Sequence, residues 1–198
     1  MIDTEIFYNE GLISRDQREK LNGHKSLIVW FTGLSGSGKS SLANALDQQL
    51  YDLKYKSFVL DGDNVRYGLS NDLSFSDQDR NENIRRAGEV SKLLMNSGII
   101  TLAAFISPFT KDRDFVRKLL PEGDFVEVYC NADFKTCELR DTKGIYRKAR
   151  MNSIKNFTGI SSVYEEPVNP ELNINTTNAT IEHCVDQILK YIKPKLLL

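Results

Sequence analysis

A glycine-rich segment between an apolar run and a helical pattern constrains this chain more than any other feature. The run Leu27–Thr32 (LIVWFT) is continuous, apolar and β-rich, which is typical of a strand buried on both faces. The next segment, Gly33–Ser40 (GLSGSGKS), fits the pattern G-x-x-x-x-G-K-[ST], and residues at helical spacing follow it. This order predicts a parallel α/β fold with a phosphate-binding loop (P-loop) after a central strand.

The residue types in this loop explain why phosphates would bind there. Gly33, Gly36 and Gly38 permit positive φ angles, so successive backbone N–H groups can point inward around an anion. The following helix directs its partial positive end at the same place. We predict that Lys39 reaches the β- and γ-phosphates of a nucleoside triphosphate and that the Ser40 hydroxyl coordinates Mg²⁺. The alternative, a chance glycine turn, gives no reason for the strand and helix on either side.

Other apolar runs alternate with helical patterns along the chain, at residues 58–60, 99–106, 125–130 and 172–175. This alternation predicts three layers, a parallel β-sheet flanked by helices, with right-handed crossovers. The clearest helix starts at the capping-box pattern Ser76–Asp79 and stops at Gly98, and a last helix covers Thr180 to Ile192 before Pro194. We expect one domain of 198 residues with a polar N-terminal segment at 1–26, where Ser14 caps a short helix.

Composition argues against several classes of partner. The net charge of −1 and the pI near 6.2 do not suit a general nucleic-acid binder. The longest apolar run, Ile99–Ile106, is far shorter than the roughly 20 residues of a membrane span. The N-terminus does not resemble a signal peptide, and the three cysteines lack the spacing of a metal site. We therefore expect a cytoplasmic protein that binds neither nucleic acid nor membrane.

Charge is uneven in one stretch. Residues 140–155 contain six cations and one acid, Asp141. In a chain of net charge −1, this excess favours an anionic partner, although a solvated helix face is the simpler interpretation. Together with the P-loop, the stretch predicts a basic lid at about 140–160 that closes over phosphates and excludes water.

Candidate acceptor-binding residues follow the second and third apolar runs, at the carboxyl edge where α/β proteins bind ligands. Asp63 could hold Mg²⁺ through water or accept a proton from an attacking hydroxyl, or Asp61 and Asp63 could be simple turn residues. Arg66, Arg80 and Asn83 add donors suited to an anion, and Arg80 and Asn83 share one helix face. Two arginines near a P-loop suggest a phosphorylated or sulfated acceptor.

Three further residues have two readings each. Ser107, in FISP, could contact substrate or act as a nucleophile, or it could cap the turn before Pro108. Phe75 and Phe157 stand in polar loops and could sandwich a purine ring, or they could anchor those loops.

The blocks FTGLSGSGKSSLANAL, LDGDNVRYGLSNDLSFSDQDRNENIRR, FISPF, LLPEGDFVEV, RDTKGIY and IKNFTGI occur here in the order found in adenylylsulfate kinases. The resemblance spans roughly Phe7 to Ile192. DGDNVR, DRNENIRR and FISP together are far more specific than the P-loop alone. The family resemblance implies a P-loop kinase that uses Mg²⁺ to transfer the γ-phosphoryl of ATP to the 3′-hydroxyl of adenosine 5′-phosphosulfate (APS), giving 3′-phospho-APS (PAPS), and it suggests a homodimer.

The resemblance also implies a set of site residues. ATP would contact Gly33, Leu34, Ser35, Gly36, Ser37, Gly38, Lys39, Ser40, Ser41, Arg140 and Ala179, with adenine near Arg140 and the Thr177–Ala179 turn. APS would contact Asp63, Asn64, Val65, Arg66, Phe75, Arg80, Asn83, Ile106, Ser107, Lys143, Asn156 and Phe157. Asn156 departs from the glycine that similar proteins usually have before Phe-Thr-Gly.

The mechanism implied is phosphoryl transfer by positioning and charge neutralisation. Lys39, Mg²⁺ on Ser40 and lid cations such as Lys143 would neutralise the γ-phosphoryl, while Asp63 would orient or deprotonate the acceptor hydroxyl. The resemblance to bacterial members of the family also implies a phosphoserine intermediate at Ser107; we predict instead direct transfer, with Ser107 contacting APS. Two alternatives are a kinase for another small acceptor, and a binding module without catalysis. The presence of both Lys39 and Ser40 favours an enzyme.

Overall fold

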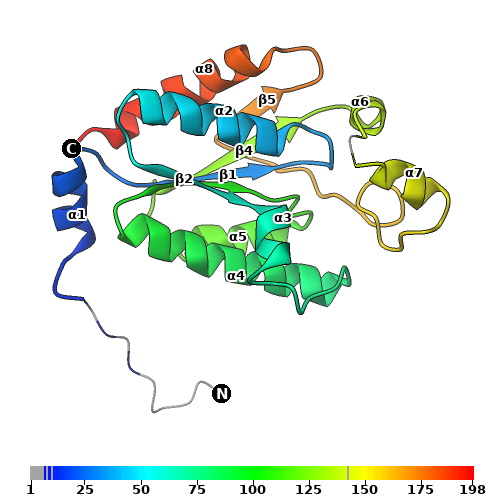
Figure 1. Cartoon of the computed structure of the whole chain (residues 1–198), viewed down its shortest axis with the longest axis horizontal. Helices are drawn as coiled ribbons and strands as arrows, with labels where there is room; N and C mark the ends of the chain where they lie inside the picture. Colours follow the sequence, from blue (N-terminus) through cyan, green and yellow to red (C-terminus); the bar gives the residue numbers. More distant parts are fainter. Residues whose placement is uncertain (1–6, 8, 10, 142) are drawn as a thin grey trace.

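The structure is a computed structural model that describes residues 7, 9, 11–141 and 143–198. In this part of the chain, five parallel strands form one sheet in the order β2-β3-β1-β4-β5 (Figure 1). The strands are β1 (Ile28–Thr32), β2 (Ser57–Asp61), β3 (Ile100–Ala104), β4 (Phe125–Asn131) and β5 (Leu172–Asn175). β1 lies between β3 and β4 and is buried throughout, as its apolar sequence predicts.

Helices cover both faces of the sheet (Figure 1). One layer contains α2 (Lys39–Asp52) and α8 (Ile181–Ile192), and the opposite layer contains α4 (Asp77–Asn96) and α5 (Thr110–Lys118). Side chains of β1 alternate between the two cores: Val29 and Phe31 pack with α2 and α8, whereas Ile28 and Trp30 pack with α4 and α5. The three-layer prediction is therefore confirmed.

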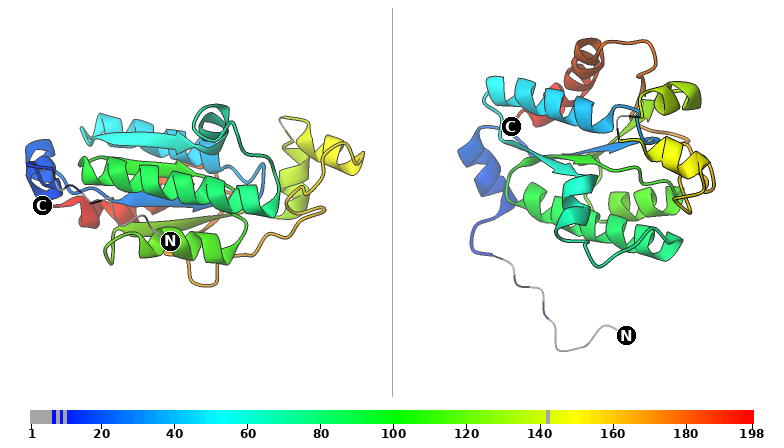
Figure 2. Two further views of the ribbon diagram at one scale, coloured as in Figure 1. Left: turned by 90° about the horizontal axis from the view of Figure 1, so that it is seen from below. Right: turned by 45° about the vertical axis from the view of Figure 1, so that its right-hand side comes forward.

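Short helices complete the fold. α1 (Arg15–Asn22) precedes the sheet, α3 (Gly62–Tyr67) follows β2, and the 3₁₀ helix η1 (Lys193–Leu196) follows α8. Between β4 and β5, α6 (Phe134–Leu139) and α7 (Ile145–Arg150) project beyond the carboxyl edge of the sheet (Figure 2). Their own small core contains Cys137, Tyr146, Ala149 and Phe157, so the predicted lid is a packed substructure.

Helix boundaries follow the capping signals in the sequence. Ser14, Ser76 and Thr180 each accept a hydrogen bond from a first-turn backbone N–H at the start of α1, α4 and α8. Gly98, with φ 84°, lies just after the end of α4. At the other predicted stop, Pro194 does end the α-helix, but the chain continues as η1. Among the described residues, no helix is long and apolar enough to cross a bilayer.

Candidate active site

The P-loop has the backbone conformation that its sequence predicts. Gly33, Gly36 and Gly38 have φ angles of 146°, 75° and 95°. A Cβ at Gly33 would lie 2.7 Å from the Cys130 carbonyl oxygen, and one at Gly36 would lie 2.7 Å from that of Cys137. α2 begins at Lys39 without a side-chain cap, so the N–H groups of its first turn remain available to an anion.

Lys39 is buried within the loop, with 9% of the residue exposed. Its Nζ donates to the backbone oxygens of Gly33 at 3.0 Å and Leu34 at 2.7 Å. Burial lowers the pKa of Lys39 to about 8, although Asp61 and Asp63 oppose this shift. The Lys39 ammonium thus lies inside the P-loop, where an anionic ligand would stabilise its charge.

Oxygen ligands suited to Mg²⁺ lie next to the P-loop. The Ser40 hydroxyl donates to Oδ2 of Asp61 at 2.6 Å. Asp61 also caps α3, because its Oδ1 accepts from the backbone N–H of Asp63 at 2.9 Å. Asp61 is therefore both the turn residue considered from the sequence and a carboxylate beside the Ser40 hydroxyl. A hydroxyl beside a carboxylate is the hard-oxygen chemistry that Mg²⁺ prefers, so these residues fit the cation.

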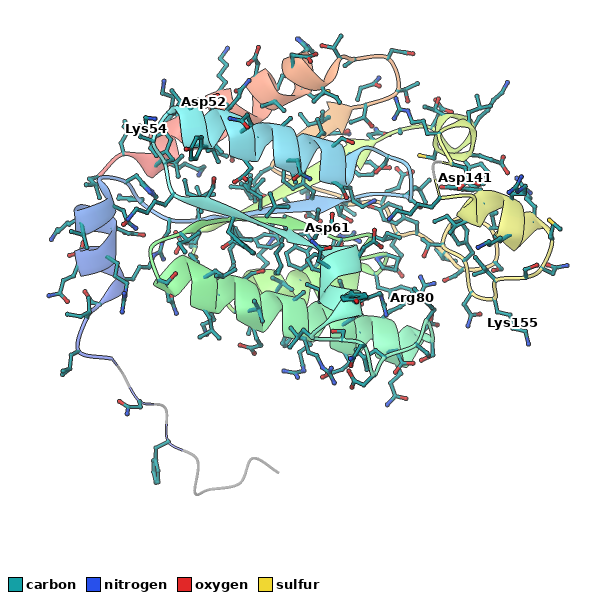
Figure 3. All side chains as sticks on the ribbon, in the orientation of Figure 1. Asp52, Lys54, Asp61, Arg80, Asp141 and Lys155 are labelled. Carbon is teal, nitrogen blue, oxygen red and sulfur yellow. The ribbon has the colours of Figure 1, made fainter. Side chains whose placement is uncertain are left out.

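Asp63 and Lys143 join the sheet edge to the lid. The exposed Asp63 carboxylate forms an ion pair with Lys143, which lies 80 positions later in the chain. Figure 3 shows Asp61 at the end of β2 on the side facing the lid, where Asp141 and Lys155 are labelled. Of the neighbours of Asp63 on α3, Val65 is buried, while Asn64 is exposed.

Two arginines, Arg66 and Arg80, lie on the side of the site where the sequence predicts that the phosphoryl acceptor binds; we call this the acceptor side. Arg66 donates to the Ser74 carbonyl at 3.0 Å, and its guanidinium lies 4.6 Å from the ring centre of Phe75. Arg80 is buried and donates to Thr158 Oγ1 and to the carbonyls of Phe75 and Asn156. Arg80 therefore ties the start of α4 to the far end of the lid.

Asn83, Phe157 and Phe75 are the other side chains predicted for the acceptor side. Asn83 is buried, and its Oδ1 has no hydrogen-bond partner among the described residues, which is unusual for a buried polar atom. Phe157 packs edge-on against Tyr146 in the lid core, with ring centres 4.9 Å apart, whereas Phe75 is 58% exposed. Phe157 thus anchors its loop in the lid core, whereas Phe75 is exposed and has the Arg66 guanidinium over its ring.

Ser107 lies in the core, behind the end of β1 and β3. The residue is 1% exposed and has a φ of 38°. Its Oγ accepts from Trp30 Nε1 at 3.1 Å and donates to Thr32 Oγ1 at 3.0 Å. The Thr32 hydroxyl in turn donates to the carbonyl of Ile106 at 2.8 Å. In this structure the Ser107 hydroxyl is therefore engaged in the core, and the Ser107 carbonyl accepts a hydrogen bond from Arg113 at 2.8 Å.

The lid meets the donor side at Arg140. Its guanidinium donates to the carbonyls of Thr176 at 2.7 Å and Thr177 at 3.3 Å and approaches that of Gly36 at 3.5 Å. The structure thus brings Arg140 and the turn containing Ala179 to one side of the P-loop.

Asn156 has φ 55°, the left-handed region in which asparagine is among the better-tolerated side chains, which accounts for its use in place of glycine.

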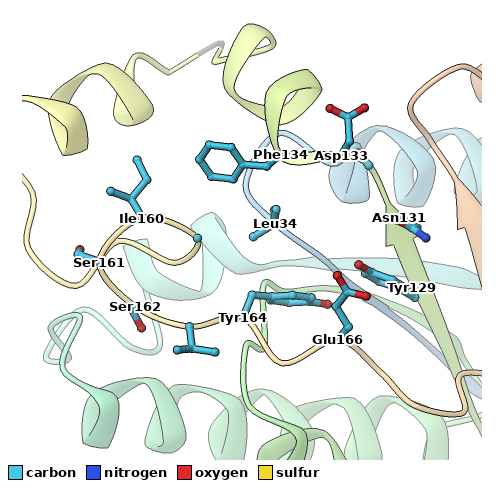
Figure 4. Close-up of a pocket in the computed structure, with 13 residues that line it drawn as sticks. Leu34, Tyr129, Asn131, Asp133, Phe134, Ile160, Ser161, Ser162, Tyr164 and Glu166 are labelled. Atoms are coloured by element: carbon cyan, nitrogen blue, oxygen red, sulfur yellow. The ribbon is translucent and has the colours of Figure 1, made fainter.

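A cleft of about 590 Å³ opens beside the P-loop (Figure 4). Its labelled lining includes Leu34, Tyr129, Phe134, Tyr164 and Glu166, from the P-loop, β4, α6 and the segment after the lid. The Tyr164 hydroxyl lies 2.9 Å from Thr32 Oγ1, which connects this cleft to the hydroxyls of the Ser107 cluster.

Sequence reasoning missed two contributors. Tyr146 donates to the Ser35 carbonyl at 2.8 Å, and Thr158 receives a hydrogen bond from Arg80. The sequence contains one signal for Tyr146, a lone aromatic within the basic stretch 140–155.

Comparisons with known proteins point to one family. The family model described as "Adenylylsulphate kinase" matches residues 25–175. The adenylyl-sulfate kinase of Prochlorococcus marinus is 56% identical over 94% of this chain and 92% of its own. That of Marinobacter nauticus is 51% identical over 98% of both.

The chain belongs to the adenylylsulfate kinase family.

A solved family member is the APS kinase of Mycobacterium tuberculosis in complex with AMPPNP and APS. It is 42% identical to this chain, with a TM-score of 0.82, over 85% of this chain and 98% of that one. Shikimate kinase from Aquifex aeolicus, 14% identical with a TM-score of 0.52, shares the fold alone.

Proposed function

We propose that this chain is an adenylylsulfate kinase, which transfers the γ-phosphoryl of ATP to the 3′-hydroxyl of APS and releases PAPS and ADP. Membership of the family and similarity to an APS kinase that binds AMPPNP and APS support this activity. The observation that carries the residue assignments is the convergence of three segments at one sheet edge. Ser40 in the donor loop contacts Asp61, and Asp63 contacts Lys143 of the lid.

On the donor side, the P-loop amides and Lys39 would bind the β- and γ-phosphates. Ser40, with Asp61 or Asp63 through water, would hold Mg²⁺, which when bound neutralises charge on the transferring phosphoryl. Arg140 and Ala179 would border the adenine, because Arg140 already bridges the P-loop and the Thr176–Thr177 backbone.

On the acceptor side, Arg66 and Arg80 would supply positive charge for the phosphosulfate, and the free Oδ1 of Asn83 would accept from a polar hydrogen of APS. Phe75 offers an exposed ring for stacking on the adenine of APS, and Phe157 would be the second aromatic of this site. The remaining proposed contacts, largely through backbone, come from Asn64, Val65, Ile106, Ser107 and Asn156.

The transfer itself is a single displacement. The 3′-oxygen forms a bond to the γ-phosphorus as the bond to the β–γ bridging oxygen breaks, and ADP leaves. Asp63 would accept or orient the hydroxyl proton. Lys143, which faces Asp63 here, would turn to the γ-phosphoryl once substrates separate the pair, and the closed lid would exclude water.

Domain, partner and compartment assignments belong to the same proposal. We propose one catalytic domain over residues 1–198 with an N-terminal segment at 1–26 and a lid at about 140–160. A cytoplasmic homodimer that takes ATP and APS, without a nucleic-acid or membrane partner, is the form that the family resemblance suggests.

A coupled assay of ADP release tests the function. Purified protein with ATP and Mg²⁺ receives APS, AMP, GMP or shikimate as acceptor, and a sample without acceptor measures ATP hydrolysis. We expect release above this background with APS alone among the four. Faster release with any of the other three acceptors would assign the chain to a different small-molecule kinase.

A further inference from the structure

A buried hydroxyl makes one of the contacts between the lid and the P-loop. Tyr146 is the second residue of α7 and is 1% exposed. Its ring packs among Phe134, Phe157 and Cys137, and its hydroxyl leaves this cluster to donate to the Ser35 carbonyl oxygen at 2.8 Å. Burial raises the pKa of Tyr146, so the hydroxyl stays protonated and remains a donor.

This hydrogen bond fixes the direction of a particular peptide. The described chain contains no cis peptide bond, so the N–H of Gly36 points opposite to the Ser35 carbonyl. The carbonyl is drawn toward the lid, and the Gly36 N–H is therefore turned toward the interior of the loop. Gly36, with φ 75°, supplies the left-handed residue that an anion-binding nest requires.

The residue that follows Ser35, Gly36, also lies against α6 and the start of the lid. Gly36 lies so close to Cys137 that a Cβ would meet the Cys137 carbonyl at 2.7 Å, and the Arg140 guanidinium approaches the Gly36 carbonyl. One turn of the P-loop, Ser35–Gly36, thus contacts three residues of a single segment: Cys137, Arg140 and Tyr146. Three positions before Tyr146, Lys143 pairs with Asp63 on the acceptor side.

We propose that Tyr146 is a positioning residue for the donor nucleotide: its hydroxyl sets the Ser35–Gly36 peptide so that the Gly36 N–H binds ATP phosphate only when the lid is seated. This inference rests on the proposed function and extends it to a residue outside the phosphate-binding motif. Closure of the lid and alignment of the Gly36 N–H would then occur together. The same segment also carries Lys143, which pairs with Asp63 beside the predicted APS site. ATP bound under an open lid would lack one aligned donor, which limits its hydrolysis by water.

The test compares Tyr146→Phe with the wild-type protein. Phenylalanine keeps the ring in the lid core and removes only the hydroxyl. The matched control is Ser91→Ala, because the buried Ser91 hydroxyl also donates to a backbone carbonyl, that of Ala87 at 2.7 Å, but within α4. Three quantities are measured for each protein: the Kd for ADP by calorimetry, kcat and KM for ATP and APS, and the thermal midpoint.

We expect Tyr146→Phe to lower kcat/KM for ATP and to raise the Kd for ADP by about tenfold, the scale of one aligned donor hydrogen bond. The KM for APS should stay within about twofold, and the thermal midpoint should fall no further than in Ser91→Ala.

Two results would overturn the proposal. Nucleotide binding within twofold of wild type would show that the peptide keeps its direction without Tyr146. A parallel loss of ATP and APS affinity, with a thermal midpoint well below that of Ser91→Ala, would show that Tyr146 only holds the lid together. Absence of APS-dependent turnover in the wild type would refute the proposed function instead, and the ADP titration would still decide the role of Tyr146.

Discussion

Lys39 makes nucleotide affinity depend on pH in a way that can be worked out from its burial. The pKa of Lys39 is lowered to about 8 because the ammonium is desolvated inside the P-loop. Polyphosphate stabilises the charged form and raises this pKa, so binding near pH 8 takes up a proton. Affinity should therefore be greatest below pH 8 and decrease as pH rises, since the free protein then holds a neutral lysine that must first be protonated.

The size of the effect follows from the fraction of protonated Lys39. At pH 9, one pH unit above the pKa, about one molecule in eleven carries the charge, so the Kd for ADP should be about tenfold higher than at pH 7, or ~1.4 kcal/mol. Two thiols near Lys39 are harder to deprotonate than a free cysteine: burial raises the pKa of Cys130 to about 12 and also raises that of Cys137.

Calorimetric titration of ADP at half-unit steps from pH 7 to 9.5 measures this dependence. Repeating the titration at pH 8 in two buffers of different ionisation enthalpy measures the proton uptake, which we expect to be about half a proton per ADP. Lys39→Met is the control, with weaker binding and a flat profile over the same range. A flat profile in the wild type, or a decrease of equal size in Lys39→Met, would refute the assignment of the titration to Lys39.

Two further substitutions test the proposed chemistry. Asp63→Asn should lower kcat by about 100-fold or more and leave the calorimetric Kd for APS within about tenfold, because a proton acceptor acts mainly in the transition state; lost APS binding with normal kcat would make Asp63 a binding residue. Ser107→Ala should retain turnover but lower the free energy of unfolding by about 1–3 kcal/mol in denaturant titrations, since Trp30 loses its buried acceptor. Retention of configuration at phosphorus with chiral γ-phosphate ATP, or no turnover in Ser107→Ala at saturating APS, would contradict direct transfer.

The sequence by itself determined the features that depend on local patterns. Continuous apolar runs marked the buried strands, and Ser14, Ser76 and Thr180 marked the starts of three helices, because a cap acts within one turn. The positive φ angles of the P-loop followed from its glycines, since other residues adopt that conformation at a cost. The family resemblance likewise came from contiguous blocks.

Tertiary structure alone decided how distant segments meet. Nothing in the spacing of Lys143 or Tyr146 says that they contact Asp63 and Ser35, which lie 80 and 111 positions away. The position of the Ser107 side chain also depends on distant residues, because its hydroxyl forms hydrogen bonds in the core with Trp30 and Thr32 of β1. The carboxyl ends of parallel strands converge at one edge regardless of their order in the chain, so the contacts made there depend on how the sheet assembles.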